Sequence, residues 1–299
     1  MTIPKIVHHI GPADKSRWHP IWGPCYSSWK EKFLGTEFYY WNDQDDLENF
    51  ISDEYPQFAD TFKQFPYSVM KYNFSRFALL HHFGGIYTDM DIFCYDDFYD
   101  DIKTKETVLV ENYLAETVNA EVPYEICLMA SAKGNSYFMD CMETSVEHFH
   151  RLKHLFDKES IDDQWLCMQT TDSFILMQAR DIHNPKQIDL LSYPIYNNRA
   201  SSYNKTFLTK HMRSSAWNRK YKSDQYLIIG NLLFSVAADD PSIDFLLQKA
   251  ESANINHTIV NIEDFDFYTD YSNGSYFDGS INDKTLKHKT KQLYEYMIK

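Results

Sequence analysis

The sequence has no cysteine pair at CxxC spacing and no cluster of cysteines. Its five cysteines are scattered over 299 residues, at Cys25, Cys94, Cys127, Cys141 and Cys167. An odd, scattered set predicts neither a disulfide framework nor a structural zinc site. It favours a protein that works in a reducing compartment.

Long hydrophobic runs are also missing. The longest apolar run, at residues 226–238, is too short to span a bilayer and contains Asn231. The first residues, Met1 to Val7, lack the charged segment and apolar stretch of a secretory signal. We therefore expect a soluble protein without a transmembrane segment. The expected location is the cytoplasm, with peripheral contact at the inner face of the membrane left open.

Positive charge is scarce as well. The 29 Lys and Arg residues face 43 Asp and Glu residues, which gives a formal charge of −14. A field of that sign repels phosphate backbones, so nucleic acid is excluded as the expected partner. An acidic protein can still hold a nucleotide diphosphate if a divalent cation and a few local basic side chains reverse the sign.

Strand and helix patterns alternate along the first third of the chain. This alternation predicts an α/β protein in which helices cover a mostly parallel sheet. The expected strands are 5–10, 37–41 and 86–93, and the expected helices are 25–33, 45–55, a segment after Pro56, and 68–83.

The remainder of the chain has less regular patterns. Here we expect strands at 107–111, 125–130 and 225–237, helices at 136–156, 172–180 and 242–253, a loop at 197–217 and a Lys-rich helix at the end. We divide the chain into a catalytic domain, 1–220, and a C-terminal α/β extension, 221–299, that packs on it.

Two aspartates follow a double glycine in the segment Gly84-Gly85-Ile86-Tyr87-Thr88-Asp89-Met90-Asp91. Asp89 and Asp91 are two residues apart at the end of an expected strand, so their carboxylates should project to the same side. Two such carboxylates can hold Mn²⁺ or Mg²⁺ and leave positions for water and phosphate oxygens. The metal then stabilises a diphosphate leaving group.

The Asp-x-Asp pattern occurs at two other places in the chain. Asp43 and Asp45 precede an expected helix, so we interpret them as capping residues. Asp264 and Asp266 lie in a stretch rich in Tyr, Phe and Asp that we interpret as a surface or turn. Only the middle pair has the flanking residues described next.

Motifs over the first ninety residues resemble glycosyltransferase family 32, the family of DXD-containing sugar-binding regions that includes Och1-like and bacterial capsular polysaccharide transferases. More distantly, they resemble clostridial glucosylating toxins. The motifs occur in the family's order: Ile3-Pro4-Lys5-Ile6-Val7-His8-His9-Ile10, Ser28-Trp29, Tyr40-Trp41, Arg76-Phe77, Gly84-Gly85-Ile86-Tyr87 and Asp89-x-Asp91. The resemblance fades after about residue 140.

The resemblance implies a GT-A fold, a UDP- or GDP-linked sugar donor, a divalent cation and retention of anomeric configuration. It implies that Arg76 contacts the diphosphate or a donor-sugar hydroxyl. Asn73 lies three residues earlier, on the same helical face. The family usually has Asp at that position, so we expect a changed donor preference.

The same resemblance implies further site residues. Lys210-His211-Met212-Arg213-Ser214-Ser215-Ala216-Trp217 is similar to the family's H-x-x-x-S-x-W motif. His211 is thereby a third metal ligand, and Lys210 and Trp217 are donor contacts, unless the segment is a surface loop. His8, Trp41 and Tyr87 are the other expected donor-binding residues. The alternatives are a structural role for His8 and a core position for Trp41.

The expected function is transfer of a sugar from a nucleotide sugar to a glycan or lipid-linked oligosaccharide in bacterial surface polysaccharide synthesis. Asp89, Asp91 and Arg76 are the expected catalytic residues. We expect front-face substitution, because no carboxylate can be assigned as a nucleophile. The alternatives are an effector that glycosylates a host protein and, because of Asn73, a donor-binding pseudoenzyme. A phosphohydrolase using the same aspartates has no support in the flanking residues.

Overall fold

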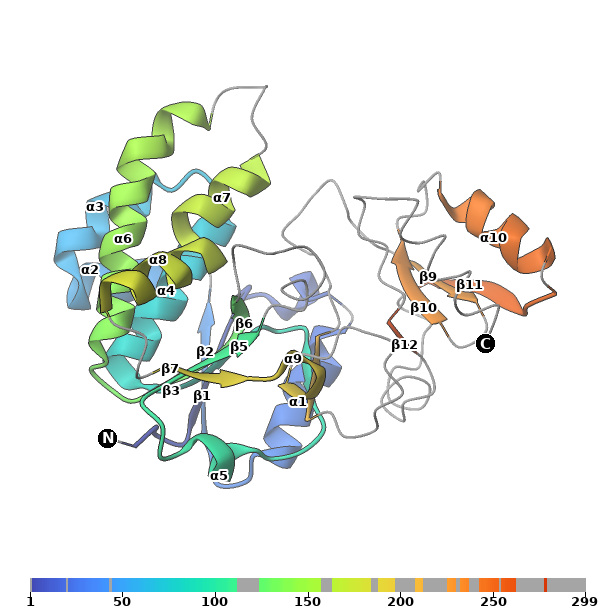
Figure 1. Ribbon diagram of the computed structural model, residues 1–299, viewed down its shortest axis with the longest axis horizontal. Coiled ribbons are helices and arrows are strands. Elements are labelled where there is room, and N and C mark those ends of the chain that lie inside the picture. The colour runs from blue at the N-terminus through green and yellow to red at the C-terminus, as the bar shows by residue number, and fades with distance from the viewer. Residues whose placement is uncertain are drawn as a thin grey trace.

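The centre of the protein is a six-stranded sheet with strand order β2-β1-β3-β6-β5-β7 (Figure 1). Within this sheet β6 runs opposite to the other five strands. The predicted α/β fold with a mostly parallel sheet is confirmed. The strands are β1 (Ile6–Gly11), β2 (Glu37–Asn42), β3 (Gly85–Thr88), β5 (Thr107–Glu111), β6 (Tyr124–Ser131) and β7 (Ile188–Leu191).

The coordinates are a computed structural model. It describes residues 2–19, 21–42, 45–111, 124–156, 163–183, 188–196, 208–211, 225–229, 232–236, 242–252, 254–261 and 277–278.

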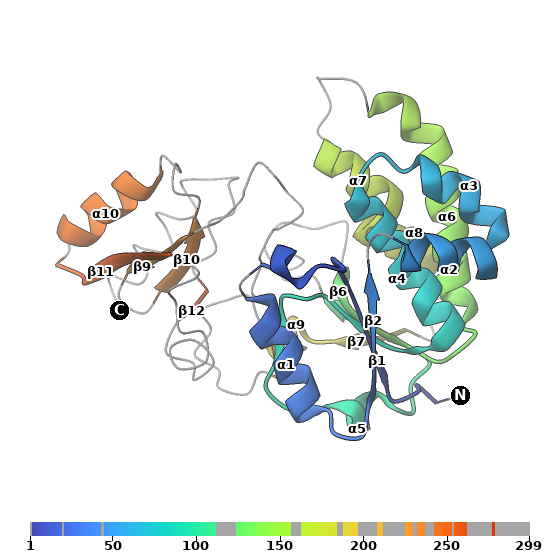
Figure 2. The same ribbon diagram turned by 180° about the vertical axis from the view of Figure 1, so that it is seen from behind.

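Helices cover both faces of the six-stranded sheet (Figures 1 and 2). One face has α1 (Trp22–Lys32), α5 (Tyr99–Ile102) and α9 (Tyr193–Tyr196). The other has α2 (Asp46–Glu54), α3 (Pro56–Gln64), α4 (Ser68–Phe83), α6 (Ser136–Leu152), α7 (Asp163–Thr171) and α8 (Ser173–His183). Two short 3₁₀ turns, Lys15–Arg17 and Lys153–Leu155, complete the described helices of this part.

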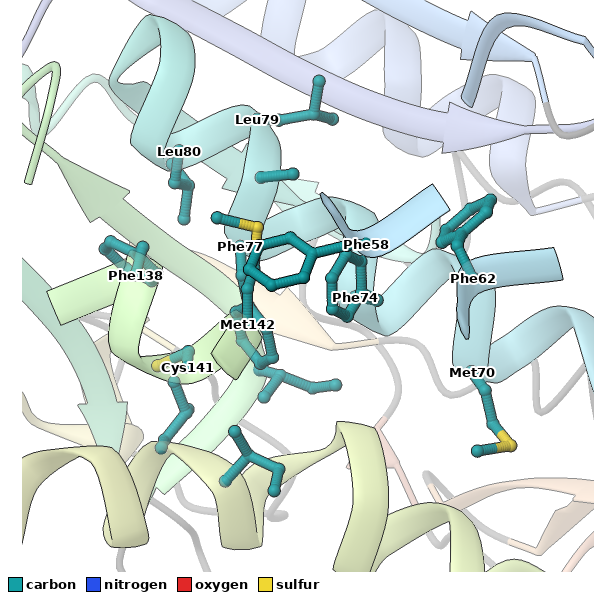
Figure 3. Packing of buried hydrophobic residues seen from close by; sticks show 14 of the residues in the cluster. Phe58, Phe62, Met70, Phe74, Phe77, Leu79, Leu80, Phe138, Cys141 and Met142 are labelled. Carbon is teal, nitrogen blue, oxygen red and sulfur yellow. The ribbon is translucent and has the colours of Figure 1, made fainter. Parts of the chain in front are cut away.

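Helix α4 lies at the centre of the larger hydrophobic core. Its residues from Asn73 to Leu80 are all buried, and Phe74 and Phe77 have no exposed surface. Figure 3 shows these two rings packed among side chains of α3 and α6. The stretch from Asn73 to Leu80 therefore has no solvent face, and a polar residue within it requires partners inside the protein.

The double glycine lets the chain pass directly from α4 into β3. Gly84 and Gly85 have φ of 69° and 92°, a region that residues with a Cβ rarely adopt. A Cβ on Gly85 would lie 2.6 Å from the backbone oxygen of Ile6 in β1. One on Gly84 would lie 2.6 Å from the backbone nitrogen of Lys133. The two glycines therefore allow both the turn and the close approach of neighbouring backbone.

The predicted strand 86–93 is wrong in its extent, because the chain turns after Thr88. Strand β4 (Ile92–Cys94) leaves the central sheet and pairs with β8 (Thr209–His211) in a separate two-stranded sheet. The pairing of residues 209–211 also shows that the expected loop 197–217 contains a strand. Helix α7 and strand β7 were not predicted.

The described C-terminal residues form a second sheet, with strand order β11-β9-β10-β12. The single strand expected at 225–237 is a hairpin of two strands, because the chain reverses between residues 229 and 232. The elements are β9 (Gln225–Ile229), β10 (Leu232–Val236), α10 (Ser242–Ser252), β11 (His257–Asn261) and β12 (Phe277–Asp278).

Some predictions for the second half lie outside the described residues. These are the domain boundary near 220, the aspartates at 264 and 266 and the Lys-rich terminal helix. The domain division therefore stays a prediction. All five cysteines are described and buried, and none is joined to another by a disulfide bond. Within the described ranges, no helix combines the length and apolar character needed to cross a membrane.

Candidate functional site

Arg76, Tyr87 and Asp89 form a hydrogen-bonded cluster at the carboxyl end of β3. Arg76 Nη2 lies 2.9 Å from Asp89 Oδ1, and the Tyr87 hydroxyl donates to the same oxygen at 2.7 Å. The guanidinium carbon of Arg76 lies 4.9 Å from the centre of the Tyr87 ring. Helix α4 supplies the cation and β3 supplies the phenol, so the double glycine fixes the distance between the two.

The electrostatics of this cluster keep Arg76 charged and Tyr87 neutral. Burial alone would lower the pKa of Arg76, but the carboxylates of Asp89 and Asp172 outweigh it, and the pKa is raised. Burial raises the pKa of Tyr87 well above its ordinary value. Asp89 thus accepts from a permanent cation and from a neutral hydroxyl.

Asp89 and Asp91 lie in a turn, not in a strand. The backbone nitrogen of Ile92 donates to the carbonyl of Asp89 at 3.2 Å, which closes the turn. The expectation that strand alternation directs both carboxylates to one side is therefore wrong, because the pleat ends at Thr88. Neither carboxylate projects freely into water: the Asp89 side chain is 22% exposed and Asp91 is buried.

Asp91 lies near the helix on the other face of the sheet. Its charge contributes to the raised pKa of the buried Cys25 thiol of α1, although burial is the larger cause. Helix α1 is tied to β4 directly after the turn. Trp29 Nε1 donates to the carbonyl of Ile92 at 2.8 Å, and Ser28 Oγ accepts from the backbone nitrogen of Cys94 at 2.9 Å. These bonds hold the segment that follows Asp91.

Strand β8 brings the predicted downstream motif to the same turn. His211 pairs with Ile92, and Lys210 pairs with Phe93. Paired Cα atoms of antiparallel strands are about 4.5–5.5 Å apart, so the backbone of His211 lies opposite the residue after Asp91. The side chains of Lys210 and His211, and all of Trp217, lie outside the described residues. Their roles stay predictions.

His8 and Trp41 have protein partners away from Asp89. His8 Nε2 lies 2.9 Å from the carbonyl of Gly84, and Trp41 Nε1 donates to His8 Nδ1 at 3.3 Å. Burial lowers the pKa of His8 to about 4, so the ring is neutral, with its proton on Nε2. Trp41 packs against Phe50 and Phe83. The contacts support the structural alternative for both residues.

Asn73 has a partner that the sequence did not indicate. Its side chain is almost fully buried, and Nδ2 donates to Asp172 Oδ2 at 3.2 Å. Asp172 precedes α8 and also accepts from the backbone nitrogen and hydroxyl of Ser173. An aspartate before a serine at a helix start is typical of an N-cap, and 99 residues separate Asp172 from Asn73. Nothing in the spacing could have joined them.

The donor atoms at the turn fit a hard divalent cation. Asp89 and Asp91 offer carboxylate oxygens, the ligands that Mg²⁺ and Mn²⁺ prefer. In the part of the chain that the structure describes, no three His, Cys, Asp or Glu side chains gather as a ready metal site. A cation here would depend on the two aspartates, on water and phosphate oxygens, and on His211 if its imidazole reaches the turn.

A known protein family matches this part of the chain. Residues 21–109 match the family described as a glycosyltransferase sugar-binding region containing a DXD motif. This segment is therefore similar to the sugar-binding regions of DXD-containing glycosyltransferases. The region contains the cluster of Arg76, Tyr87 and Asp89, and the DXD motif is the pair Asp89 and Asp91.

Curated relatives that match this part of the chain include fungal mannosyltransferases. Inositol phosphoceramide mannosyltransferase 1 of Schizosaccharomyces pombe is 29% identical over 94 residues, which is 31% of this chain and 29% of that protein. Mannosyl phosphorylinositol ceramide synthase SUR1 of Saccharomyces cerevisiae is 26% identical over 149 residues, or 50% of this chain and 36% of that protein. The chain thus matches about a third of the length of these relatives.

Solved structures give a weaker likeness. A glycosyltransferase named PaToxG matches with a TM-score of 0.43 and 15% identity, covering 62% of this chain and 71% of that one. The glycosyltransferase GlyE of Streptococcus pneumoniae matches with a TM-score of 0.41 and 13% identity, covering 73% and 56%. Similarity at this level assigns no residue roles.

Proposed function

We propose that the chain is a metal-dependent glycosyltransferase that uses a nucleotide sugar and retains its anomeric configuration. The buried cluster of Arg76, Tyr87 and Asp89 is the observation that supports this most directly. Placing a guanidinium in the buried middle of helix α4 costs free energy, so a structural role alone is a poor explanation for it. The cluster ends at the partly exposed carboxylate of Asp89, inside the segment that matches the sugar-binding region.

Each residue of the cluster has a role in this proposal. Arg76 orients the carboxylate of Asp89 and contributes positive charge where the diphosphate leaves. Tyr87 donates to the same carboxylate and fixes its rotamer. Asp91, with Asp89, would hold Mn²⁺ or Mg²⁺, and the bound ion would neutralise the diphosphate. Lys210, His211 and Trp217 remain proposed contacts of the metal and the donor.

The proposed reaction is front-face substitution. The acceptor oxygen forms a bond to the anomeric carbon while the bond from that carbon to the phosphate oxygen breaks. The departing phosphate oxygen takes the acceptor proton on the same face, so no protein nucleophile is required. The protein contributes positioning and electrostatic stabilisation, which together account for most of the catalysis in such a scheme.

The names of the relatives suggest which donors and acceptors to test first. They are called mannosyltransferases of inositol phosphoceramide, so GDP-mannose precedes UDP-sugars in the order of testing. We propose a lipid-borne acceptor, and a lipid with a phosphoinositol head group is the first acceptor to test. The second is a lipid-linked oligosaccharide of a bacterial surface polysaccharide, and the third is a host protein. Transfer of a labelled sugar from the donor into lipid extract, glycan or protein distinguishes these three acceptors.

The pseudoenzyme alternative rested on the missing charge at position 73. The contact between Asn73 and Asp172 weakens it, because Asp172 supplies a carboxylate within hydrogen-bonding distance of that amide. A pseudoenzyme would bind UDP or GDP without turning over any sugar nucleotide.

The decisive experiment replaces Asp91 with Ala and with Asn. Hydrolysis of GDP-mannose and of UDP-sugars is measured with Mn²⁺, with Mg²⁺ and with EDTA, alongside thermal unfolding. The expected result is loss of metal-dependent turnover in both variants while the fold is retained. Asp100→Asn is the matched control, because Asp100 lies exposed on α5. Undiminished turnover by Asp91→Ala would exclude this site.

A further inference from the structure

We infer that Asp172 binds the hexose of the donor and determines which sugar is accepted. This inference rests on the proposed function and deepens it, because it names a sugar contact that lies far outside the sugar-binding region. Asp172 is contributed by the turn between α7 and α8. It meets the two polar residues of α4 that point toward that turn.

The contacts place Asp172 beside Asn73 and close to Arg76. Asn73 Nδ2 donates to Asp172 Oδ2, and the carboxylate and the guanidinium of Arg76 attract each other. Arg76 in turn holds Asp89 at 2.9 Å. The four side chains therefore form one connected group, with a cation between two carboxylates and an amide beside one of them.

Two buried polar atoms of this group are unsatisfied within the described part of the protein. These are Asn73 Oδ1, an acceptor, and Arg76 Nε, a donor. Both residues are more than nine-tenths buried. An unsatisfied buried polar atom costs about 1–3 kcal/mol, so a native protein that keeps two of them three residues apart on one helix usually has a ligand or water for them.

The chemistry of these atoms matches the hydroxyl groups of a hexose. A carboxylate of Asp172 and the carbonyl oxygen of Asn73 can each accept from a sugar hydroxyl. Arg76 Nε can donate to a sugar oxygen. Adjacent acceptors and a donor suit two neighbouring hydroxyls of defined configuration, because each hydroxyl both donates and accepts. A sugar with one of those hydroxyls inverted would leave a buried group unpaired.

The cluster can be reached from solvent. Asn73 and Arg76 are buried, but Asp172 and Asp89 are both partly exposed. A sugar that contacts these two carboxylates would lie over the amide and the guanidinium between them. Asp89 is also where the diphosphate is expected, so the sugar and the phosphates of one donor can occupy neighbouring positions.

The identities of residues 73 and 172 depend on each other. An aspartate at 73 would put a second carboxylate about 3 Å from Asp172, where like charges cannot both ionise without cost. An amide at 73 avoids this repulsion and donates to Asp172 instead. One carboxylate and one amide are thus the stable combination, and exchanging the two would move the charge across the cluster.

The test separates sugar binding from nucleotide binding. In calorimetry with Mn²⁺, the affinities of GDP and UDP are compared with those of GDP-mannose, UDP-glucose, UDP-galactose and UDP-N-acetylglucosamine. For the preferred donor we expect Asp172→Asn to lower affinity for the nucleotide sugar at least about tenfold and to leave nucleoside diphosphate affinity unchanged. Asp181→Asn, an exposed change on α8, is the control and should alter neither.

The double variant Asn73→Asp with Asp172→Asn completes the test. It keeps one carboxylate and one amide, so we expect it to bind a nucleotide sugar again, with an altered order of preference among the four donors. If Asp172→Asn does not fold, Asp172→Glu replaces it and should change the order of preference.

Equal affinities of the wild type and of each folded Asp172 variant for every nucleotide sugar would overturn the inference. That result with intact nucleoside diphosphate binding would leave the proposed function standing. A wild type that binds neither GDP nor UDP would instead contradict the proposed function itself, and the inference with it.

Discussion

Replacing Arg76 with methionine tests the buried cluster most severely. Methionine fills similar space on α4 but removes the cation between Asp89 and Asp172. The Arg76 side chain is 9% exposed and that of Asp89 is 22% exposed, so solvent screens their ion pair only weakly. Removing one partner of a buried pair costs about 3–5 kcal/mol, because the other charge is left without compensation. The partial exposure of Asp89 favours the lower end, about 3 kcal/mol.

The loss should be visible in unfolding experiments. For a protein of 299 residues, about 3 kcal/mol corresponds to a fall in melting temperature of about 5 °C. The difference in free energy of unfolding between the wild type and Arg76→Met should become smaller as the pH is lowered from about 8 to about 5. An unpaired buried carboxylate has a raised pKa and takes up a proton on folding, so the variant gains stability relative to wild type as pH falls. Turnover of the donor should be absent.

Arg180→Met is the matched control for this prediction. Arg180 pairs with Asp181 on α8, but that pair is more exposed than the pair of Arg76 and Asp89, at 28% and 58%. Its removal should therefore cost less than about 1 kcal/mol. A melting temperature of Arg76→Met within about 2 °C of wild type, or a loss that does not depend on pH, would refute the account of the cluster.

Three further changes test other parts of the structure, each by urea unfolding. Gly85→Ala should lower the free energy of unfolding by about 3 kcal/mol, because the new Cβ meets the backbone of β1 at a φ of 92°. The control is Gly35→Ala, at a φ of 71° with open space around it, which should lower it by about 1 kcal/mol. Equal losses in the two variants would exclude the clash. Burial lowers the pKa of His9 to about 3, so this neutral ring contributes stability at neutral pH that is lost as pH falls below about 6.5. Between about pH 6.5 and pH 5, the free energy of unfolding should therefore fall by about 2 kcal/mol less in His9→Phe than in the wild type. An equal fall in both proteins would contradict this. Burial raises the pKa of the Asp172 carboxyl, so the folded wild type loses stability as pH rises through that raised pKa. Asp172→Asn should therefore be at least as stable as wild type at about pH 7.5 despite weaker donor binding, and a clear loss there would indicate a structural role.

Much of the site's framework could be predicted from the sequence because it is local. The apolar spacing of residues 68–83 places Asn73 and Arg76 on one helix, and the double glycine ends that helix directly before β3. The resemblance named Arg76, Tyr87 and Asp89, and the structure joins these three through hydrogen bonds to one oxygen.

Other features depended on contacts between residues distant in the chain. The reversed direction of β6, the departure of β4 toward β8 and the packing of His8 with Trp41 all arise from long-range pairing. Sequence patterns report a residue's own propensity and its near neighbours. They do not report which segment folds back against which.

The sequence by itself determined that one arginine and two aspartates border a helix, a double glycine and a strand. The tertiary structure decided that Asp172 meets Asn73 and that the two aspartates lie in a turn. The physical reason is that helix and strand periodicity act over a few residues. The meeting of α4 with the start of α8 instead depends on how α6, α7 and α8 pack around the core.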